Sequence, residues 1–469
     1  MKFNLLHTLF CLLFSISFQV SAQIEKSKSL RRYTINGYVK DAATGESLIG
    51  ASISLKGRSK GITSNQYGFY SITVEEGNYS IISTFIGYKS QVISINLNSD
   101  TLLNINLISG QNLSEEVIVT SKKRESNIKT SQMSKISLPI DQIKSVPAFL
   151  GEVDLLKVVQ LLPGVKNGGE GSAGIYVRGG GADQNLILLD DAVVYNTGHL
   201  FGFFSIFNSD AIKNISLIKG GMPAQYGGRL SSVLDVSMKD GNNKKFQVEG
   251  GIGLIASRLS IQGPIIKNKS SFIISARRMY IDALSKPFIS KSSQFSGSGY
   301  YFYDLNTKVN YEFNEKNKLY LSGYFGRDVF DFANSRQSLK INIPWGNATG
   351  TIRWNHVFNK KLFANTTGVF NDYRFTFNAL QNNLQIKLSS GIQDLSIKQD
   401  FDYYPSSSHK IKFGGIYTYH KFFPSVISGK QDSVTFDPLN AQTKFAREAG
   451  IYIQDDWNLN AKIQVNTGL

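Results

Sequence analysis

The stretch Tyr301–Phe313, YFYDLNTKVNYEF, decides the fold of the C-terminal half. Its odd positions carry mostly apolar or aromatic side chains: Tyr301, Tyr303, Leu305, Thr307, Val309, Tyr311 and Phe313. Its even positions are mostly polar: Phe302, Asp304, Asn306, Lys308, Asn310 and Glu312. Because neighbouring side chains of a strand point to opposite faces, one face suits lipid and the other suits water. The same alternation recurs in 318–325 and 410–419.

Strand length and loop length separate a membrane barrel from a soluble sheet with one buried face. The alternating segments run for about ten residues, which a tilted strand needs to cross a bilayer, and aromatic residues lie near their ends. One set of predicted connections is short: 267–270, 314–317, 359–361, 406–409 and 460–462. The other set is longer: 282–298, 328–343 and 422–444. Alternating short and long connections are typical of outer-membrane barrels.

We therefore expect residues 246–469 to form the N-terminal part of an incomplete antiparallel transmembrane β-barrel. About eleven strands can be counted, and the sequence stops in mid-strand at 466–469. An open sheet edge would leave unpaired backbone groups in lipid, and plugged barrels have about 22 strands. We expect this sequence to be a fragment that lacks about half of its barrel.

Residues 1–22 have the pattern of a secretory signal peptide, with Lys2, an apolar run and the small residues Val20-Ser21-Ala22. The only cysteine, Cys11, lies within it, so the exported chain can form no disulfide and has no thiolate chemistry. The formal charge of +16 is scattered singly along predicted strands. Together with export, this argues against a nucleic-acid partner and favours lipid headgroups or an anionic ligand.

Residues 33–108 are predicted to form a β-sandwich, because short alternating strands are separated by turns about every ten residues. The pattern GYVKDAATGESLIGASISL, followed by GITSNQYGFYSITV and GNYSIISTFIGY, resembles the carboxypeptidase regulatory-like domain at the front of many Bacteroidetes outer-membrane receptors. No histidine here is followed by Glu three positions later, as zinc carboxypeptidases require; His199 begins His-Leu-Phe-Gly. We interpret the domain as a module without enzymatic activity.

Residues 136–241 contain four motifs in a fixed order. A predicted helix at 153–162 is followed by an Arg-Gly, a Leu-Leu-Asp strand, an Ile-Lys-Gly strand and a Tyr-Gly-Gly turn before a strand at 232–238. This series resembles the plug domain of TonB-dependent receptors, an α+β fold. The motif residues are Arg178, Gly179, Asp190, Lys219, Gly220, Tyr226, Gly227, Gly228 and Arg229. One departure is Asp190-Asp191, where many relatives have Asp-Gly, so the turn there is expected to differ.

The resemblance implies that TonB and its inner-membrane energising complex move the plug. An extended receptor segment would add a strand to TonB. Within the linker 113–135, the residues that resemble this TonB box are Glu116, Val117, Ile118, Val119 and Thr120. The alternative is that they form an ordinary final strand of the sandwich.

We expect the motif glycines to allow positive φ or close approach. The motif Arg and Lys residues are expected to pair with barrel carboxylates such as Glu312 or Asp304. A ligand is expected at the outward tip of the plug, with these candidate residues: Tyr195, His199, Phe201 and Phe203. A single histidine in an aromatic loop is more often structural than ligand-binding.

The sequence thus predicts a mainly β outer-membrane importer with its N-terminal domain in the periplasm, in contact with lipid and lipopolysaccharide. Its ligand could be a siderophore, cobalamin, a glycan or a peptide. A ligand-sensing signal transducer is the alternative, although that usually needs a different N-terminal domain; a structural adhesin is disfavoured by the plug motifs. The sequence contains no His-Glu-x-x-His and no phosphate loop, so we expect no enzyme, cofactor or metal site. The plug also looks too short and too different for the starch-utilisation (SusC-like) branch.

Overall fold

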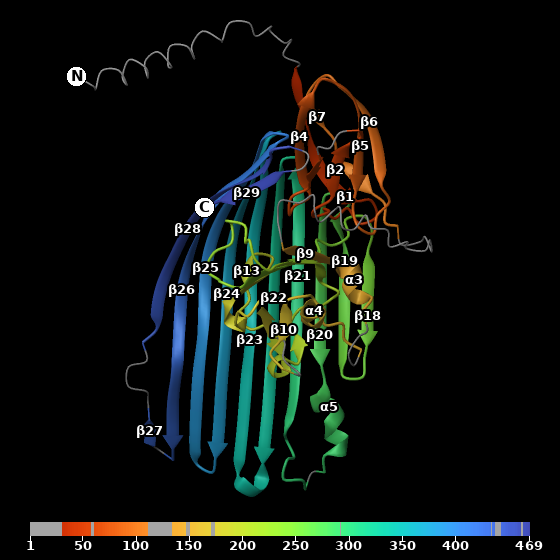
Figure 1. The fold of residues 1–469 in the computed structure, drawn as a ribbon. Coiled ribbons are helices and arrows are strands. Elements are labelled where there is room, and N and C mark those ends of the chain that lie inside the picture. Colours follow the sequence, from red (N-terminus) through yellow and green to blue (C-terminus); the bar gives the residue numbers. More distant parts are fainter. Residues whose placement is uncertain are drawn as a thin grey trace, which may run out of the picture.

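The computed structural model describes residues 31–57, 61–110, 134–146, 151–169, 174–290, 292–432, 434–436, 442–460 and 463–469. The described residues form an N-terminal sandwich, a central domain and one large antiparallel sheet that curves around the central domain (Figure 1). The predicted mainly β fold class is confirmed. The signal peptide and nearly all of the linker 113–135 lie outside the described residues.

Two four-stranded sheets make up the N-terminal sandwich. The first contains β1 (Arg32–Asp41), β4 (Phe69–Glu75), β7 (Thr101–Leu102) and β8 (Ile105–Leu107). The second contains β2 (Ser52–Leu55), β3 (Gly61–Thr63), β5 (Gly77–Thr84) and β6 (Gln91–Leu97). Alternate residues such as Ile35, Ile53 and Ile81 are buried between the sheets, because strand side chains alternate between core and solvent.

The central domain is built on a five-stranded mixed sheet in the order β13-β12-β17-β16-β9. Its elements are β9 (Lys135–Pro139), α3 (Ile140–Lys144), α4 (Leu155–Gln160), β10 (Val165–Asn167), β11 (Ile175–Val177), η1 (Ala182–Gln184), β12 (Asn185–Leu189), β13 (Ala192–Val193), β14 (Gly198–His199), η2 (Leu200–Gly202), β15 (Phe204–Ser205), β16 (Ile212–Ile218) and β17 (Ser232–Met238). The side chain of Asp154 caps α4 by accepting hydrogen bonds from the backbone N–H groups of Leu156 and Lys157. Leu155 and Val159 on α4 pack with Ile215 and Leu234 of the sheet.

The large sheet follows the chain from β18 to β29. Its elements are β18 (Gln247–Ile252), β19 (Ala256–Ile266), β20 (Ser270–Met279), α5 (Ile281–Ser285), η3 (Lys286–Phe288), β21 (Gly299–Asn314), β22 (Asn317–Asn334), η4 (Ser335–Gln337), β23 (Leu339–Asn359), β24 (Leu362–Gln381), β25 (Leu384–Ser406), β26 (His409–Gln431), β27 (Val434–Phe436), β28 (Lys444–Asn458) and β29 (Gln464–Gly468). Eleven of these strands lie on one antiparallel path within the described residues, and β27 pairs only with β26.

The predicted alternation of side chains is present along the large sheet. On β21 the even positions are mostly buried toward the central domain, whereas Leu305 and Val309 point away and are exposed. Outward apolar residues continue across the neighbouring strands: Leu321, Phe325, Ile352, Trp354, Leu395, Ile397, Ile451 and Ile453. This face suits lipid. Within the described residues no helix is long and apolar enough to span a membrane.

Two of the expected long loops are shorter than predicted, because β26 continues to Gln431 within 422–444 and strands also extend into 328–343. Most of 328–343 is strand, because β22 continues to Asn334 and β23 begins at Leu339. The connection between β24 and β25 is also a tight turn, at Asn382 and Asn383. The backbone groups of both hairpins pair in register. Strands of up to 23 residues result, far longer than a membrane requires.

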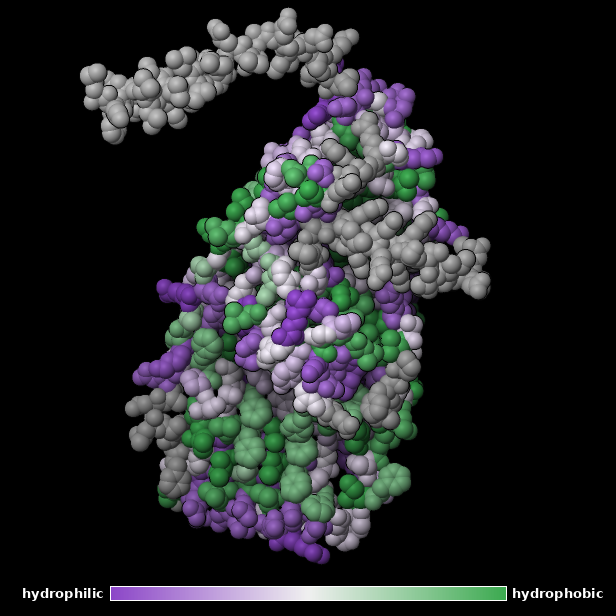
Figure 2. Space-filling view, in the orientation of Figure 1, coloured by the Kyte–Doolittle hydropathy of each residue, from purple (hydrophilic) through white to green (hydrophobic). Residues whose placement is uncertain are grey.

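The two ends of the large sheet differ. The N-terminal sandwich lies at the short-turn end, where β21–β22, β23–β24 and β25–β26 connect (Figure 1). The opposite, long-loop end carries α5, η4 and β27. Figure 2 shows hydrophobic side chains on the sheet between the central domain and a polar rim at the long-loop end.

Candidate functional site

The tip of the central domain is a strained hairpin that faces the long-loop end. Strands β14 and β15 pair His199 with Phe204, and between them Leu200 has φ 48° and Phe201 has φ 54°. Such left-handed residues without a glycine cost roughly 1–2 kcal/mol each. The surrounding contacts must therefore hold this loop in place.

His199 makes several of the contacts that hold this loop. It is only 1% exposed, and its Nδ1 lies 2.8 Å from Oδ2 of Asp328. Its Nε2 lies 3.3 Å from Oδ2 of Asp304, and its ring stacks on Phe302 with centroids 3.9 Å apart. Burial by itself lowers the pKa of His199, but the two carboxylates outweigh burial and raise this pKa above its usual value.

Asp328 also anchors the strained backbone. Its Oδ1 accepts a hydrogen bond from the N–H of Leu200 at 3.1 Å and another from the hydroxyl of Tyr300. The N–H of Leu200 also donates to the Tyr300 hydroxyl oxygen, at 2.5 Å. We call His199, Tyr300, Asp304 and Asp328 the histidine clamp. It ties the tip of the central domain to strands β21 and β22.

A cavity of about 600 Å³ opens beside this tip, within the size range of sites for small ligands. Five aromatic side chains line it: Tyr195, Phe201, Trp345, Tyr373 and Phe375. Asp183 and Arg229 contribute one charge of each sign. Phe201 remains 61% exposed and its ring lies 4.8 Å from that of Trp345. The apical cavity therefore offers ring faces contributed by both the central domain and the sheet.

A second cluster lies on the opposite side of the central domain, where β12 turns into β13. Asp190 and Asp191 both have positive φ, 47° and 71°, as in the tight turns that favour Asn-Gly or Asp-Gly. The two carboxylates reach the sheet wall. Asp190 lies 2.9 Å from Nζ of Lys308, and Asp191 lies 2.6 Å from Nη2 of Arg353.

Burial by itself raises the pKa of Asp191, but Arg353 and Lys398 outweigh burial and lower this pKa below its usual value. Asp191 therefore carries its charge at this turn. The departure at this turn adds an ion pair without abolishing the turn.

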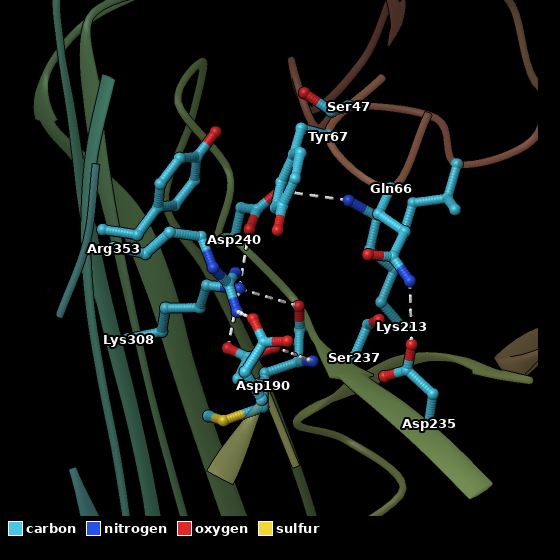
Figure 3. Close-up of a pocket in the computed structure, with 14 residues that line it drawn as sticks. Ser47, Gln66, Tyr67, Asp190, Lys213, Asp235, Ser237, Asp240, Lys308 and Arg353 are labelled. Atoms are coloured by element: carbon cyan, nitrogen blue, oxygen red, sulfur yellow. Dashed lines mark hydrogen bonds and ion pairs between the residues drawn. The ribbon is translucent and has the colours of Figure 1, made fainter. Parts of the chain in front are cut away.

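Three parts of the chain meet at this turn (Figure 3). Lys308 also contacts Asp240 at 2.9 Å, and Gln66 of the N-terminal sandwich donates a hydrogen bond to Asp235 at 3.0 Å. Burial, and then the charge of Asp191, raise the pKa of Asp235. We call this set the three-part junction. A cavity of about 40 Å³ lies within it, room for water rather than for a ligand.

The structure corrects the expected partners of the motif cations. Arg178 donates to Oγ of Ser134 and Lys219 donates to the carbonyl of Pro163, so neither pairs with Glu312 or Asp304. Glu312 pairs with Lys40 and Lys318 instead. Asp304 pairs with Arg277 and His199. Sequence spacing does not reveal most of these partners, because only Glu312 and Lys318 lie close in the chain, opposite each other across the β21–β22 hairpin.

The other motif residues serve local geometry or the cavity. Gly179, Gly220 and Gly228 have positive φ, whereas Gly227 does not. Tyr226 donates to Asp235 at the three-part junction. Arg229 donates to the carbonyl of its neighbour Gly228 and lines the apical cavity.

The four expected ligand residues divide. Tyr195 and Phe201 line the apical cavity. His199 is buried in its clamp and does not line the cavity. Phe203 packs against Phe204 and Lys157 instead. Sequence reasoning missed Trp345, Tyr373 and Phe375 as residues of the cavity. All three occupy odd-numbered positions of β23 and β24, and this alternation could have indicated that they share one face of the sheet. The expected TonB box, 116–120, lies outside the described residues.

Two family models match the chain. The model for the CarboxypepD_reg-like domain matches residues 35–119, which include the N-terminal sandwich. The model for the TonB-dependent Receptor Plug Domain matches residues 130–232, most of the central domain. The first match also runs over 116–119, so it leaves both interpretations of the expected TonB box open.

Two curated relatives match a little under half of the chain. The TonB-dependent receptor P26 of Formosa agariphila is 29% identical over 224 residues, 45% of this chain and 21% of that protein. The TonB-dependent receptor SusC of Bacteroides thetaiotaomicron is 26% identical over 223 residues, 45% of this chain and 22% of that protein. The match thus spans about a fifth of the length of these relatives. The similarity to SusC runs against our expectation that the chain is too different from that branch.

Solved structures share the fold. The ferric enterobactin receptor of Pseudomonas aeruginosa has a TM-score of 0.52 at 14% identity, over 74% of this chain and 58% of that one. The siderophore receptor PirA of Acinetobacter baumannii has a TM-score of 0.52 at 14% identity, over 72% of this chain and 56% of that one. At these identities the likeness shows the fold alone.

The central domain matches a plug-domain model, and a curved antiparallel sheet lies around it, as in the solved structures that share this fold. This chain carries a CarboxypepD_reg-like domain followed by a TonB-dependent Receptor Plug Domain, and it is similar to curated TonB-dependent receptors. The central domain is called the plug from here on.

Proposed function

We propose that this protein imports a scarce ligand across the outer membrane and that TonB drives the import. The observation that carries the proposal is the seating of the plug, whose buried Asp190 and partly buried Asp191 pair with Lys308 and Arg353 of the sheet. Breaking a buried ion pair typically costs about 3–5 kcal/mol. A plug held in this way needs an external source of work, which fits coupling to an energised inner-membrane complex.

The apical cavity is the proposed ligand site. It lies at the long-loop end, which would face outward if the sandwich is periplasmic. Aromatic rings from plug and sheet would contact the flat or apolar faces of a ligand, while Asp183 and Arg229 would orient its polar groups. A siderophore, a glycan, cobalamin or a peptide can offer such faces.

The histidine clamp would transmit ligand binding to the rest of the plug. Phe201 lines the cavity two residues beyond His199, which binds Asp304 and Asp328 of the sheet. A ligand that moves Phe201 would therefore strain the clamp. The expected TonB box at 116–120 would report this change on the periplasmic side.

Growth assays test transport. A deletion strain would be supplied with single iron sources or single glycans and complemented with the wild type, Val117→Pro or the linker control Lys123→Pro. Proline removes a strand N–H donor, so Val117→Pro should abolish growth on the imported nutrient at normal receptor abundance. Wild-type growth of Val117→Pro would reject the TonB box.

Protease resistance distinguishes the two interpretations of residues 116–120, a strand of the sandwich or a TonB-binding segment. If 116–120 were the final strand of the sandwich, Val117→Pro would make the sandwich more sensitive to protease, and Lys123→Pro would not. If 116–120 binds TonB, both variants would resist protease like the wild type.

Two phenylalanines on β24 test the ligand site. Phe375 lines the cavity, whereas Phe370 lies on the same strand and is 41% exposed. Phe375→Ala should raise the nutrient concentration for half-maximal growth about tenfold, since a lost aromatic anchor costs about 1–2 kcal/mol. Phe370→Ala should leave it unchanged. Equal effects would reject the cavity as the ligand site.

A further inference from the structure

The N-terminal sandwich grips the plug through two side chains. Nε2 of Gln66 donates to Oδ2 of Asp235 at 3.0 Å and to the hydroxyl of Tyr226 at 3.2 Å. Oε1 of Glu46 accepts hydrogen bonds from the N–H groups of Asp240 and Gly241, at 2.5 and 3.2 Å. These contacts fall on β17, on Tyr226 before it and on the segment that follows it into the large sheet.

The same sandwich also grips the sheet. Nδ2 of Asn65 donates to Oδ2 of Asp402 at 2.9 Å, and Lys40 pairs with Glu312 at 3.0 Å. Fully buried Phe69 stacks on Phe363, with ring centroids 5.3 Å apart. The contacts with the sheet are therefore both apolar and polar, unlike those of a domain held only by its linker.

One loop, held by its own hydrogen bonds, takes part in both grips, that is, in the contacts with the plug and in those with the sheet. Asn65 contacts the sheet and its neighbour Gln66 contacts the plug. Oδ1 of Asn65 accepts hydrogen bonds from the N–H groups of Tyr67 and Phe69, both at 2.9 Å, and Gly68 takes the left-handed conformation that closes the turn. A shift of the plug along the sheet would have to break one of the two grips.

We infer that the N-terminal sandwich is a clamp that keeps the plug seated in the resting receptor, by binding plug and sheet at once through the Asn65–Gly68 loop. This function concerns the resting protein and goes beyond the proposed transport. Withdrawal of the sandwich would leave Asp235, Asp402 and the N–H groups of Asp240 and Gly241 without these partners.

The test uses the full-length receptor in planar lipid bilayers, without ligand or TonB. The measurement is the urea concentration at which ionic current rises as the plug leaves the barrel, at mildly alkaline pH. Gln66→Glu places a carboxylate opposite Asp235 and should lower this concentration. The double variant Gln66→Glu with Asp235→Asn restores a donor facing an acceptor and should recover it.

Asn96→Ala is the matched control, because Asn96 is exposed on β6 and belongs to neither grip. It should behave like the wild type. The inference is overturned if Gln66→Glu and Asn96→Ala conduct at the same urea concentration, or if the double variant shows no recovery. Heat-dependent gel mobility verifies that each barrel is folded. The test measures no transport. A negative result would therefore reject the proposed role of the N-terminal sandwich and leave the import proposal untouched.

Discussion

Oδ2 of Asp191, at a plug turn with φ 71°, lies 2.6 Å from Nη2 of Arg353 on the sheet wall. The turn thus accepts backbone strain at the residue that makes the ion pair. A glycine there would relieve strain of roughly 1–2 kcal/mol, whereas leaving Arg353 buried without its partner costs about 3–5 kcal/mol. The ion pair outweighs the strain.

Asp191→Gly is therefore expected to loosen the plug, even though glycine suits the turn. Hydrogen exchange at β12 and β13 should become faster, by an amount equivalent to about 2 kcal/mol, the difference between those two effects. Adding Arg353→Met removes the unpaired charge and should restore much of the protection. Slower exchange in Asp191→Gly alone would show that strain dominates.

The histidine clamp should make plug seating depend on pH. Because the pKa of His199 is raised in the folded protein, its stabilising effect is fully present below the unfolded pKa of about 6.5. The effect is lost as pH rises through the higher folded value. Hydrogen exchange at β14 and β15, corrected for intrinsic rates, should accelerate at high pH in the wild type.

The control for this prediction is His199→Gln, which keeps hydrogen-bonding groups but cannot take a charge. Its corrected exchange rates should vary little over the same pH range. Equal pH dependence in both proteins would assign the effect to another group.

Phe201→Gly should separate ligand binding from stability. Glycine removes the left-handed strain at φ 54°, but it also gains freedom in the unfolded chain, about 0.5–1 kcal/mol, and loses the contact with Trp345. The free energy of unfolding should change by less than about 1 kcal/mol. If the apical cavity binds a transported ligand as proposed, growth on that ligand should nevertheless need a higher concentration. An unchanged requirement would remove Phe201 from the proposed ligand site.

Gly220→Ala should destabilise the plug, whereas Gly227→Ala should not. Gly220 has φ 152°, and a Cβ there would lie 2.6 Å from Nη1 of Arg178. Alanine at such a position costs roughly 1 kcal/mol or more. Gly227 has ordinary φ, and a Cβ added there would meet no heavy atom within 4 Å, so it is the matched control. Thermal unfolding of the two variants in detergent would compare them, and equal melting temperatures would contradict the prediction.

The sequence alone determined the mainly β fold and the order of the three parts. Alternation along 301–313 is a local property, because the pleat of a strand places successive side chains on opposite faces whatever the rest of the chain does. The ordered motifs between Arg178 and Arg229 likewise indicated a plug, since each is a short contiguous pattern. The ends of the strands were harder to predict from the sequence. Most of 328–343 continues as paired strand, because its backbone hydrogen bonds depend on the neighbouring strands.

Only the tertiary structure decided the partners of the charged and aromatic residues. Asp191 meets Arg353, His199 meets Asp328, and Gln66 meets Asp235 across separations of 162, 129 and 169 positions. Nothing in the local sequence distinguishes these carboxylates from others such as Glu312, since attraction between charges depends on distance and burial. Curvature of the sheet around the plug sets those distances, and the fold as a whole therefore selected the pairs.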